Sequence, residues 1–259
     1  MTSLQNKHAI VTGAGRGIGA AIASTLHRQG YKVTLMGRTE SHLNERVAEL
    51  NGKLGNNSQA VAVDVTNSDA VITAFEKAKA AFGPVDILVN NAGAAEARPY
   101  LKTSHDDWHN CLAVNLNGVH YCTRAALPDM VEQGAGRIIN IASTAAQKGY
   151  AYVAAYTAAK HGVLGLTRAL ALEFATKGIT VNAICPGYTE TDIVKDAIKN
   201  IMGKTGRSET EARAELTKTN PQGRLIQPQE VADTVLWLCG EQAASITGQG
   251  ISVAGGEVM

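Results

Sequence analysis

Short apolar segments that alternate with longer helical ones constrain the fold of this chain more than any other feature. The short segments are rich in β-branched residues and read HAIVTG, KVTLMG, AVAVD, DILVNN, RIINIAS, TVNAIC and ISVAGG. Because they do not alternate with polar residues, they predict strands that are buried on both faces. The pattern therefore predicts parallel βαβ units with right-handed crossovers, in a doubly wound α/β sheet of about seven strands with helices on both faces.

Stretches with helical spacing lie between these segments. They cover residues 18–29, 40–50, 69–82, 105–132, 152–177 and 229–239. No linker, internal repeat or break in composition interrupts the alternation, so we expect one domain over residues 1–259. A charged segment at about 188–225, broken by glycine and proline, follows a strand end, and we expect it to act as a substrate lid.

Composition excludes several classes of protein. The 259 residues carry 24 basic and 23 acidic side chains, and this balance gives no electrostatic reason to bind nucleic acid. No apolar run approaches the ~18 residues of a membrane helix, and the first residues do not form an export signal, so we expect a cytoplasmic protein. The four cysteines lack CxxC spacing, which indicates free thiols and no metal site.

A glycine-rich turn follows the first predicted strand and leads into the first helix. Residues 12–19 read TGAGRGIG. Glycines there allow a tight turn, close approach to a pyrophosphate and close packing of helix on strand, while the helix N-terminus offers N–H groups to phosphate. The strand before and the helix after favour phosphate binding at Gly13, Gly17, Ile18 and Gly19 over a plain turn. A P-loop is excluded, because no Gly-Lys-Ser or Gly-Lys-Thr follows.

The end of the second predicted strand bears on the choice of dinucleotide. An acidic residue there would hold the ribose hydroxyls of NAD, but the strand ends with Met36, Gly37 and Arg38. Arg38 and Arg16 could form a two-guanidinium clamp on the 2′-phosphate of NADP. The alternative is that both arginines are solvated surface charges. The sequence favours NADP(H) over NAD(H).

Three residues around the fifth predicted strand suggest proton chemistry. Ser143 ends this strand, and Tyr156 and Lys160 lie four residues apart on the next helix, on one face. An adjacent ammonium favours the phenolate and would lower the pKa of the tyrosine. The serine could hold a carbonyl oxygen while the tyrosine delivers a proton and a nicotinamide delivers hydride. By spacing alone, the pair also fits a tyrosine packed on a surface helix.

These motifs together stand in the order and spacing of the short-chain dehydrogenase/reductase family. They are TGAGRGIG, Asn90-Asn91-Ala92-Gly93, Asn115, Ser143, Tyr156 with Lys160, and Pro186-Gly187. The chain resembles this family over essentially its whole length. The resemblance implies a single-domain Rossmann fold and an NAD(P)-dependent oxidoreductase that interconverts a ketone and a secondary alcohol.

The resemblance also implies a role for each matching catalytic residue. Tyr156 would be the general acid or base, and Lys160 would lower its pKa and bind the nicotinamide ribose. Ser143 would polarise the carbonyl, and Asn115 would hold a water in the proton relay. Ser143 and Tyr156 would line the substrate pocket with Gln147 and Tyr150, which could equally be packing residues.

The residues expected along the cofactor come from several segments. Asp64 and Val65 are expected at the adenine, Asn91 to Gly93 along the adenosine ribose, and Pro186, Gly187 and Thr191 at the nicotinamide. The full predicted cofactor set is Gly13, Arg16, Gly17, Ile18, Gly19, Arg38, Asp64, Val65, Asn91, Ala92, Gly93, Tyr156, Lys160, Pro186, Gly187 and Thr191.

The substrate and the assembly are less constrained. The chain looks most like 3-oxoacyl-thioester and polyketide-type ketoreductases and hydroxyacyl dehydrogenases, so we expect a 3-oxoacyl thioester, linked to CoA or a carrier. A small alicyclic or aromatic alcohol, or a steroid, is the enzymatic alternative. A dinucleotide-binding sensor or scaffold without turnover is the alternative of another class. The resemblance suggests a homotetramer, with the helices of Asn115 and Tyr156 at the interface.

Overall fold

Seven strands form one parallel sheet in the computed structural model, which describes residues 7–259. The strands lie in the order β3-β2-β1-β4-β5-β6-β7. They are β1 (His8–Thr12), β2 (Lys32–Gly37), β3 (Ser58–Ala62), β4 (Ile87–Asn90), β5 (Gly136–Ile141), β6 (Ile179–Pro186) and β7 (Gly250–Val253). The order reverses between β1 and β4, as in a doubly wound Rossmann sheet. The predicted fold class is confirmed.

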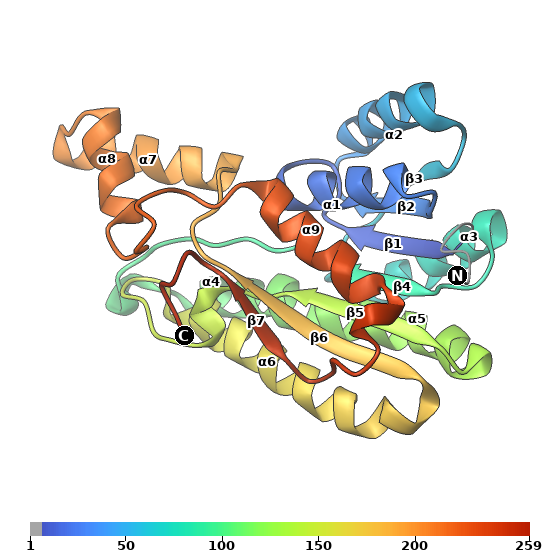
Figure 1. The fold of residues 1–259 in the computed structure, drawn as a ribbon. Coiled ribbons are helices and arrows are strands. Elements are labelled where there is room, and N and C mark those ends of the chain that lie inside the picture. Colours follow the sequence, from blue (N-terminus) through green and yellow to red (C-terminus); the bar gives the residue numbers. More distant parts are fainter. Residues whose placement is uncertain (1–6) are drawn as a thin grey trace.

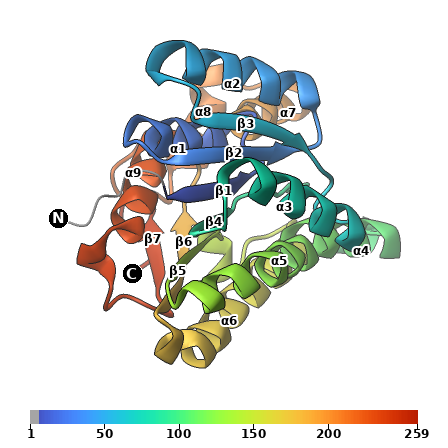
Figure 2. The ribbon, with the colours of Figure 1, turned by 90° about the vertical axis from the view of Figure 1, so that its right-hand side faces the viewer.

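Helices cover both faces of this sheet. In Figure 2, α1, α2 and α9 lie on one side and α3, α5 and α6 on the other. The helices are α1 (Gly17–Arg28), α2 (Glu40–Leu54), α3 (Ser68–Phe82), α4 (His105–Leu112), α5 (Gly118–Gln133), α6 (Ala154–Phe174), α7 (Asp192–Thr205), α8 (Glu209–Thr217) and α9 (Pro228–Cys239). Within residues 7–259, no helix is long and apolar enough to cross a membrane.

The core is divided between the two faces of the sheet. Ala, Val, Ile and Leu fill most of it, so helices can lie close to the strands. Every residue of β1, β4 and β6 is buried, as predicted. The prediction is wrong for β3 and β7, which are partly exposed. They are the edge strands, so each has a neighbouring strand on one side only and less helical cover.

A buried chain of amide and hydroxyl groups ties the middle of the sheet to two helices. Asn90 Nδ2 on β4 donates to Thr123 Oγ1 on α5 (3.0 Å) and to Asn140 Oδ1 on β5 (2.9 Å). Asn140 Nδ2 donates in turn to Thr167 Oγ1 on α6 (2.9 Å). Since buried polar groups are costly when unpaired, this chain fixes α5 and α6 relative to β4 and β5.

The long helix predicted over residues 105–132 is present, but it is not α-helical throughout. It is divided into α4 and α5 by a π-helical turn at Ala113–Asn117, and α5 accommodates Pro128. Such turns are rare and are frequent at functional sites. The helix predicted from residue 152 begins at Ala154, because Tyr152 has a φ of 69°, outside the helical region.

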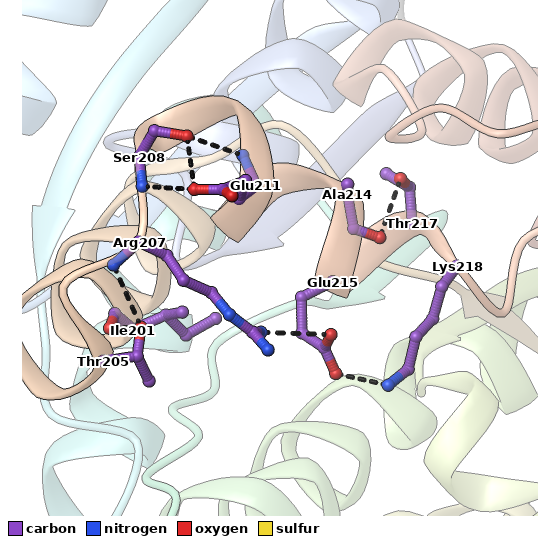
Figure 3. Close-up of polar contacts among 9 residues, drawn as sticks. All are labelled: Ile201, Thr205, Arg207, Ser208, Glu211, Ala214, Glu215, Thr217 and Lys218. Atoms are coloured by element: carbon purple, nitrogen blue, oxygen red, sulfur yellow. Dashed lines mark hydrogen bonds and ion pairs between the residues drawn. The ribbon is translucent and has the colours of Figure 1, made fainter.

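The 188–225 segment forms a small helical unit of its own, at the upper left of Figure 1. A separate apolar cluster packs α7 against α8 and contains Val194, Ile198, Ala212, Leu216 and Leu225. In Figure 3, Ser208 and Glu211 cap α8, and Glu215 pairs with both Arg207 and Lys218. The segment joins the body through two stretches, residues 187–191 and 219–226, which are called the first and second stems. The backbone N–H of Glu190 in the first stem donates to the Ile226 carbonyl in the second (2.8 Å).

The buried central strands predict a large stability loss on truncation of their side chains. Leu88 on β4 is 0% exposed, so Leu88→Ala should lower the free energy of unfolding by about 2–5 kcal/mol. Leu101 is 98% exposed, so Leu101→Ala should change it by less than about 0.5 kcal/mol. Urea unfolding of the two variants measures the difference. Equal effects would contradict the assigned core.

Candidate active site

The predicted site residues lie at the carboxyl edge of the sheet, where open α/β sheets bind ligands. The glycine-rich turn leaves β1, the Asn91–Gly93 loop leaves β4, Ser143 follows β5, and Pro186 ends β6. Parallel pairing of β1 with β4, of β4 with β5 and of β5 with β6 brings these segments side by side. Segments that are far apart in the sequence therefore form one site.

The glycine-rich turn has the geometry of a close-packed cradle. Gly13 has a φ of +64° and Gly17 of +56°, a backbone region that favours glycine. A Cβ on Gly19 would lie 2.3 Å from the carbonyl oxygen of Gly13, so α1 can approach β1 only with glycine there. Ile18, next to it, is half-buried against the core cluster on that face.

Thr12 and Asn91 hold the turn in place. The Asn91 amide donates to the carbonyl oxygens of Thr12 (2.9 Å) and Gly13 (3.2 Å). Thr12 Oγ1 accepts from the backbone N–H groups of Asn91 (2.9 Å) and Ala92 (3.0 Å). The Asn91 side chain therefore fixes the two carbonyl groups with which the glycine turn begins. Sequence reasoning missed Thr12, although it directly precedes the first glycine of the motif.

The two arginines of the predicted phosphate clamp are both exposed at this edge. Thr12 on β1 pairs with Met36 on β2, so the next residues, Gly13 and Gly37, lie side by side at this edge of the sheet. Arg38 directly follows Gly37. The Arg16 side chain is 68% exposed and lies 4.0 Å from the Asp192 carboxylate at the start of α7. Both guanidiniums are accessible to an anion, and the clamp stays a prediction.

Lys160 is a buried cation that connects the end of β5 with Tyr156. It is 4% exposed, and its Nζ donates to the carbonyl oxygen of Ile141, the last residue of β5 (2.8 Å). Its Nζ also lies 5.5 Å from the centre of the Tyr156 ring. One turn of α6 thus brings ammonium and phenol together, as their spacing predicts.

Burial controls both pKa values in this pair. It raises the pKa of the Tyr156 phenol to about 12, and a hydrogen bond with Ser143 opposes this rise. It also lowers the pKa of the Lys160 ammonium to about 8. The net pKa of the tyrosine is therefore raised, because removal from water disfavours the phenolate more than its neighbours stabilise it, and the lowering of this pKa by the Lys160 ammonium stays a prediction.

The segment after β5 holds Ser143 and one wall of the site. Ser143 Oγ accepts from the backbone N–H of Ala145 (3.1 Å), which leaves its own proton available. Tyr150 is half-buried, and its hydroxyl hydrogen-bonds to Thr144 Oγ1 (2.6 Å). Gln147 is exposed, and its amide donates to the Gly250 carbonyl on β7 (3.2 Å), so it is held against that strand.

Asn115 lies in the π-helical turn and is fully buried. Its Nδ2 donates to the carbonyl oxygens of Ala94 (2.8 Å) and Cys111 (3.0 Å), and its Oδ1 accepts from the Ala94 N–H (3.2 Å). A Cβ on Gly93 would lie 2.8 Å from Asn115 Oδ1 and 3.7 Å from Lys160 Nζ. The side chain thus fastens the loop after β4 beside Lys160, and its predicted role toward water stays a prediction.

The other predicted cofactor residues surround the cradle. Asp64 is exposed and its Oδ1 accepts from Thr66, whereas Val65 is buried and would contact a Cβ on Gly118. A Cβ on Gly17 would lie 3.3 Å from the Thr191 side chain, so the start of α7 faces the glycine turn. Across residues 7–259, no group of three or more His, Cys, Asp or Glu side chains could hold a metal ion.

Two further residues near the site escaped the sequence reasoning. Tyr188, at the first stem of the 188–225 segment, is close enough to Tyr156 and Tyr150 to contribute to the raised pKa of each phenol. Glu257 lies near the C-terminus, and its carboxylate accepts from the Tyr150 hydroxyl (2.7 Å). Tyr188 directly follows the Pro186-Gly187 motif, which was a usable signal. No spacing indicates Glu257, since only the folded path of the chain brings it there.

Similarity to known proteins agrees with this geometry. A family model described as "Enoyl-(Acyl carrier protein) reductase" matches residues 13–257. The 3-oxoacyl-acyl-carrier-protein reductase of Vibrio cholerae is 37% identical over 257 residues, 99% of each chain. The chain belongs to the short-chain dehydrogenase/reductase family. This oxidoreductase is also 39% identical over 249 residues to acetoacetyl-CoA reductase of Rhizobium meliloti, covering 96% of this chain and 97% of the relative.

A solved structure supports the same assignment. The crystal structure of a variant actinorhodin polyketide ketoreductase with NADPH matches this short-chain dehydrogenase/reductase with a TM-score of 0.94. The two chains are 37% identical, and 99% of each is covered.

The buried ammonium predicts a specific pH dependence of stability. From pH 8 to pH 10 the unfolded chain keeps the Lys160 proton while the folded chain loses it, so the lysine destabilises the fold less as pH rises. Relative to Lys160→Met, the wild type should gain on the order of 1 kcal/mol per pH unit in that window. Urea unfolding at several pH values measures this. The raised Tyr156 pKa acts only above pH 10, and a pH-independent difference would contradict the burial of the charge.

Proposed function

We propose that this enzyme uses NADPH to reduce the 3-keto group of an acyl thioester to the 3-hydroxy form, and catalyses the reverse oxidation. The observation that carries the proposal is the meeting of Ser143, Tyr156 and Lys160 at the end of β5, at the same sheet edge as the glycine cradle after β1. The named activities of the two relatives, on a carrier-linked and a CoA-linked ketoacyl group, support the substrate class.

The residues at the edge of the sheet fit a nicotinamide dinucleotide. The cradle excludes a Cβ at Gly19, and α1 begins there without a side-chain cap on its first N–H groups. Arg16 and Arg38 supply two exposed cations for a 2′-phosphate, and β2 ends without a carboxylate. The bound cofactor supplies the hydride. The NADPH in the similar ketoreductase structure supports this preference over NADH.

The protonation states suit carbonyl reduction near neutral pH. With a pKa of about 12, Tyr156 is protonated and can donate to the alkoxide oxygen that develops from the ketone. The Ser143 hydroxyl can hold that oxygen by a hydrogen bond. With a pKa of about 8, Lys160 is largely cationic at pH 7, so its charge stabilises negative charge near the phenol and can bind a ribose hydroxyl.

The 188–225 segment is proposed to act as a lid. Its first helix begins at Thr191 and Asp192, which lie next to the glycine turn, and its first stem carries Tyr188 toward the catalytic tyrosine. The segment has its own apolar cluster and is attached to the body by two stems, so it can cover both cofactor and substrate as one unit. Covering the site excludes water and strengthens the electrostatic interactions within it.

Reduction of an enoyl thioester is a second candidate, because the matched family model is described by that activity. The geometry favours the ketone. Ser143 and Tyr156 present two hydroxyl groups close together, and such a pair can bind a single oxygen. In a 3-ketone this oxygen is on the carbon that receives the hydride, whereas the corresponding carbon of an enoyl thioester carries no oxygen. Alicyclic, aromatic or steroid alcohols, and binding without turnover, remain alternatives for the same test.

We propose a cytoplasmic homotetramer that contacts its partners through α5 and α6. Exposed Val131 on α5 and Leu172 on α6 are available to such an interface. Sedimentation as a monomer would contradict it.

Turnover tests the proposed activity directly. With NADPH, acetoacetyl-CoA should be reduced, and Tyr156→Phe should lower kcat by roughly 10²- to 10⁴-fold because the proton donor is lost. The measurement is loss of NADPH absorbance. Crotonyl-CoA, a cyclic ketone and a steroid ketone serve as competing substrates. A higher kcat/KM for crotonyl-CoA would favour enoyl reduction, and no turnover with any substrate would favour a sensor.

Cofactor preference has its own test. Arg38→Asp should weaken NADPH binding by about 1.5–3 kcal/mol, because one charge-assisted phosphate contact is lost, and should change NADH binding little. Arg28→Asp, at the opposite end of α1, is the matched control. Fluorescence titration gives both dissociation constants. Equal weakening of the two cofactors would exclude the clamp.

A further inference from the structure

The last residues of the chain return to the site and contact three parts of it. The side chain of Glu257 is 1% exposed although it lies two residues from the C-terminus. Its Oε1 accepts from the Tyr150 hydroxyl (2.7 Å), from Thr219 Oγ1 (2.8 Å) and from Lys148 Nζ (3.1 Å). One buried oxygen therefore joins the segment after Ser143 to the second stem of the lid.

The other carboxylate oxygen contacts the first stem of the lid. A Cβ on Gly187 would lie 3.1 Å from Glu257 Oε2, so the absence of a side chain there allows the close approach. The Gly187 N–H donates to the Val253 carbonyl (3.1 Å), which extends the contact with the end of β7. Glu257 is thus in contact with both stems.

Backbone packing supports the same junction independently. Gly255 and Gly256 have positive φ values of 61° and 92°. A Cβ on Gly255 would lie 2.1 Å from Asn220 Oδ1, and one on Gly256 would lie 3.2 Å from Pro221. The tail therefore fits closely against the turn at Asn220 and Pro221, directly after Thr219.

A buried carboxylate with three donors is a strong positional constraint. Hydrogen bonds to charged groups are about twice as strong as those between neutral groups, and removal of the acceptor leaves the donors unpaired. Lys148 also lies 5.0 Å from the centre of the Tyr150 ring, so charge and ring are held together. Burial alone would raise the pKa of Glu257, but these donors hold it below its ordinary value, so the carboxylate stays charged near neutral pH.

We propose that Glu257 is a positioning residue that locks Tyr150 and the two stems of the lid into one arrangement, and thereby shapes the substrate side of the pocket. It acts through Tyr150, to which it is hydrogen-bonded, and through the first stem, where its Oε2 approaches Gly187. This inference rests on the proposed function for its kinetic consequence, but not for its structural one.

The kinetic consequence is a selective loss of substrate affinity. Glu257→Gln keeps the size of the side chain and removes its charge, and Thr219→Val removes only the contact with the second stem. Both variants should raise KM for acetoacetyl-CoA, Glu257→Gln by roughly tenfold and Thr219→Val by less, with kcat within about twofold. KM for NADPH should rise by a much smaller factor in Glu257→Gln, because Oε2 approaches Gly187 at the expected nicotinamide site, and should be unchanged in Thr219→Val. Glu45→Gln, an exposed carboxylate on α2, is the matched control and should behave as wild type.

The structural consequence can be measured without substrate. The lid carries trypsin sites at Lys195, Lys199, Lys204, Arg207, Arg213, Lys218 and Arg224. Loss of the Glu257 contacts should speed cleavage at these sites by severalfold in Glu257→Gln and Thr219→Val. Cleavage elsewhere should be unchanged, as measured by mass spectrometry.

These readouts separate the two proposals. If the wild type reduces no substrate, the proposed function fails while the cleavage pattern still decides the role of Glu257. Wild-type KM together with wild-type cleavage in Glu257→Gln would overturn the inference, as would equal losses of substrate and NADPH affinity. If Glu257→Gln does not fold, Thr219→Val decides by the same criteria.

Discussion

Parallel pairing of the strands is the constraint on which the rest of this structure depends. In a parallel sheet all strands end at the same edge, so each loop after a strand is delivered to one place. Here the strand order reverses between β1 and β4, and the loops after these two strands diverge toward opposite faces. The glycine turn, the Asn91–Gly93 loop, Ser143 and Pro186 meet at this edge for that reason.

The same edge requires polar groups to be buried, and several of them are paired within the fold. Asn90, Asn140 and Thr167 link two central strands to α6 by side-chain hydrogen bonds. Lys160 donates to the last carbonyl of β5, which holds its ammonium under the phenol of Tyr156. Stability and chemistry thus use the same contacts, because the groups that place α6 on the sheet also place the proton donor.

Burial gives this site a protonation pattern that spacing alone does not predict. The adjacent ammonium was expected to lower the pKa of the tyrosine, whereas removal from water raises it to about 12 and lowers that of Lys160 to about 8. A protonated phenol beside a cationic amine is suited to deliver a proton during ketone reduction. The same burial predicts that the lysine destabilises the fold at neutral pH, as is common where a site is built for chemistry.

Local sequence by itself determined the strand and helix pattern, the glycine turn, and the spacing of Tyr156 and Lys160 on one helix face. These depend on neighbours in the chain, through hydrophobic period and backbone freedom, so reading the residues in order was sufficient. Tertiary structure alone decided that β3 and β7 are edge strands, that a π-helical turn divides α4 from α5, and that burial dominates both pKa values. It also decided that Glu257 reaches Tyr150 and Thr219, since contacts between distant residues depend on the folded path of the whole chain.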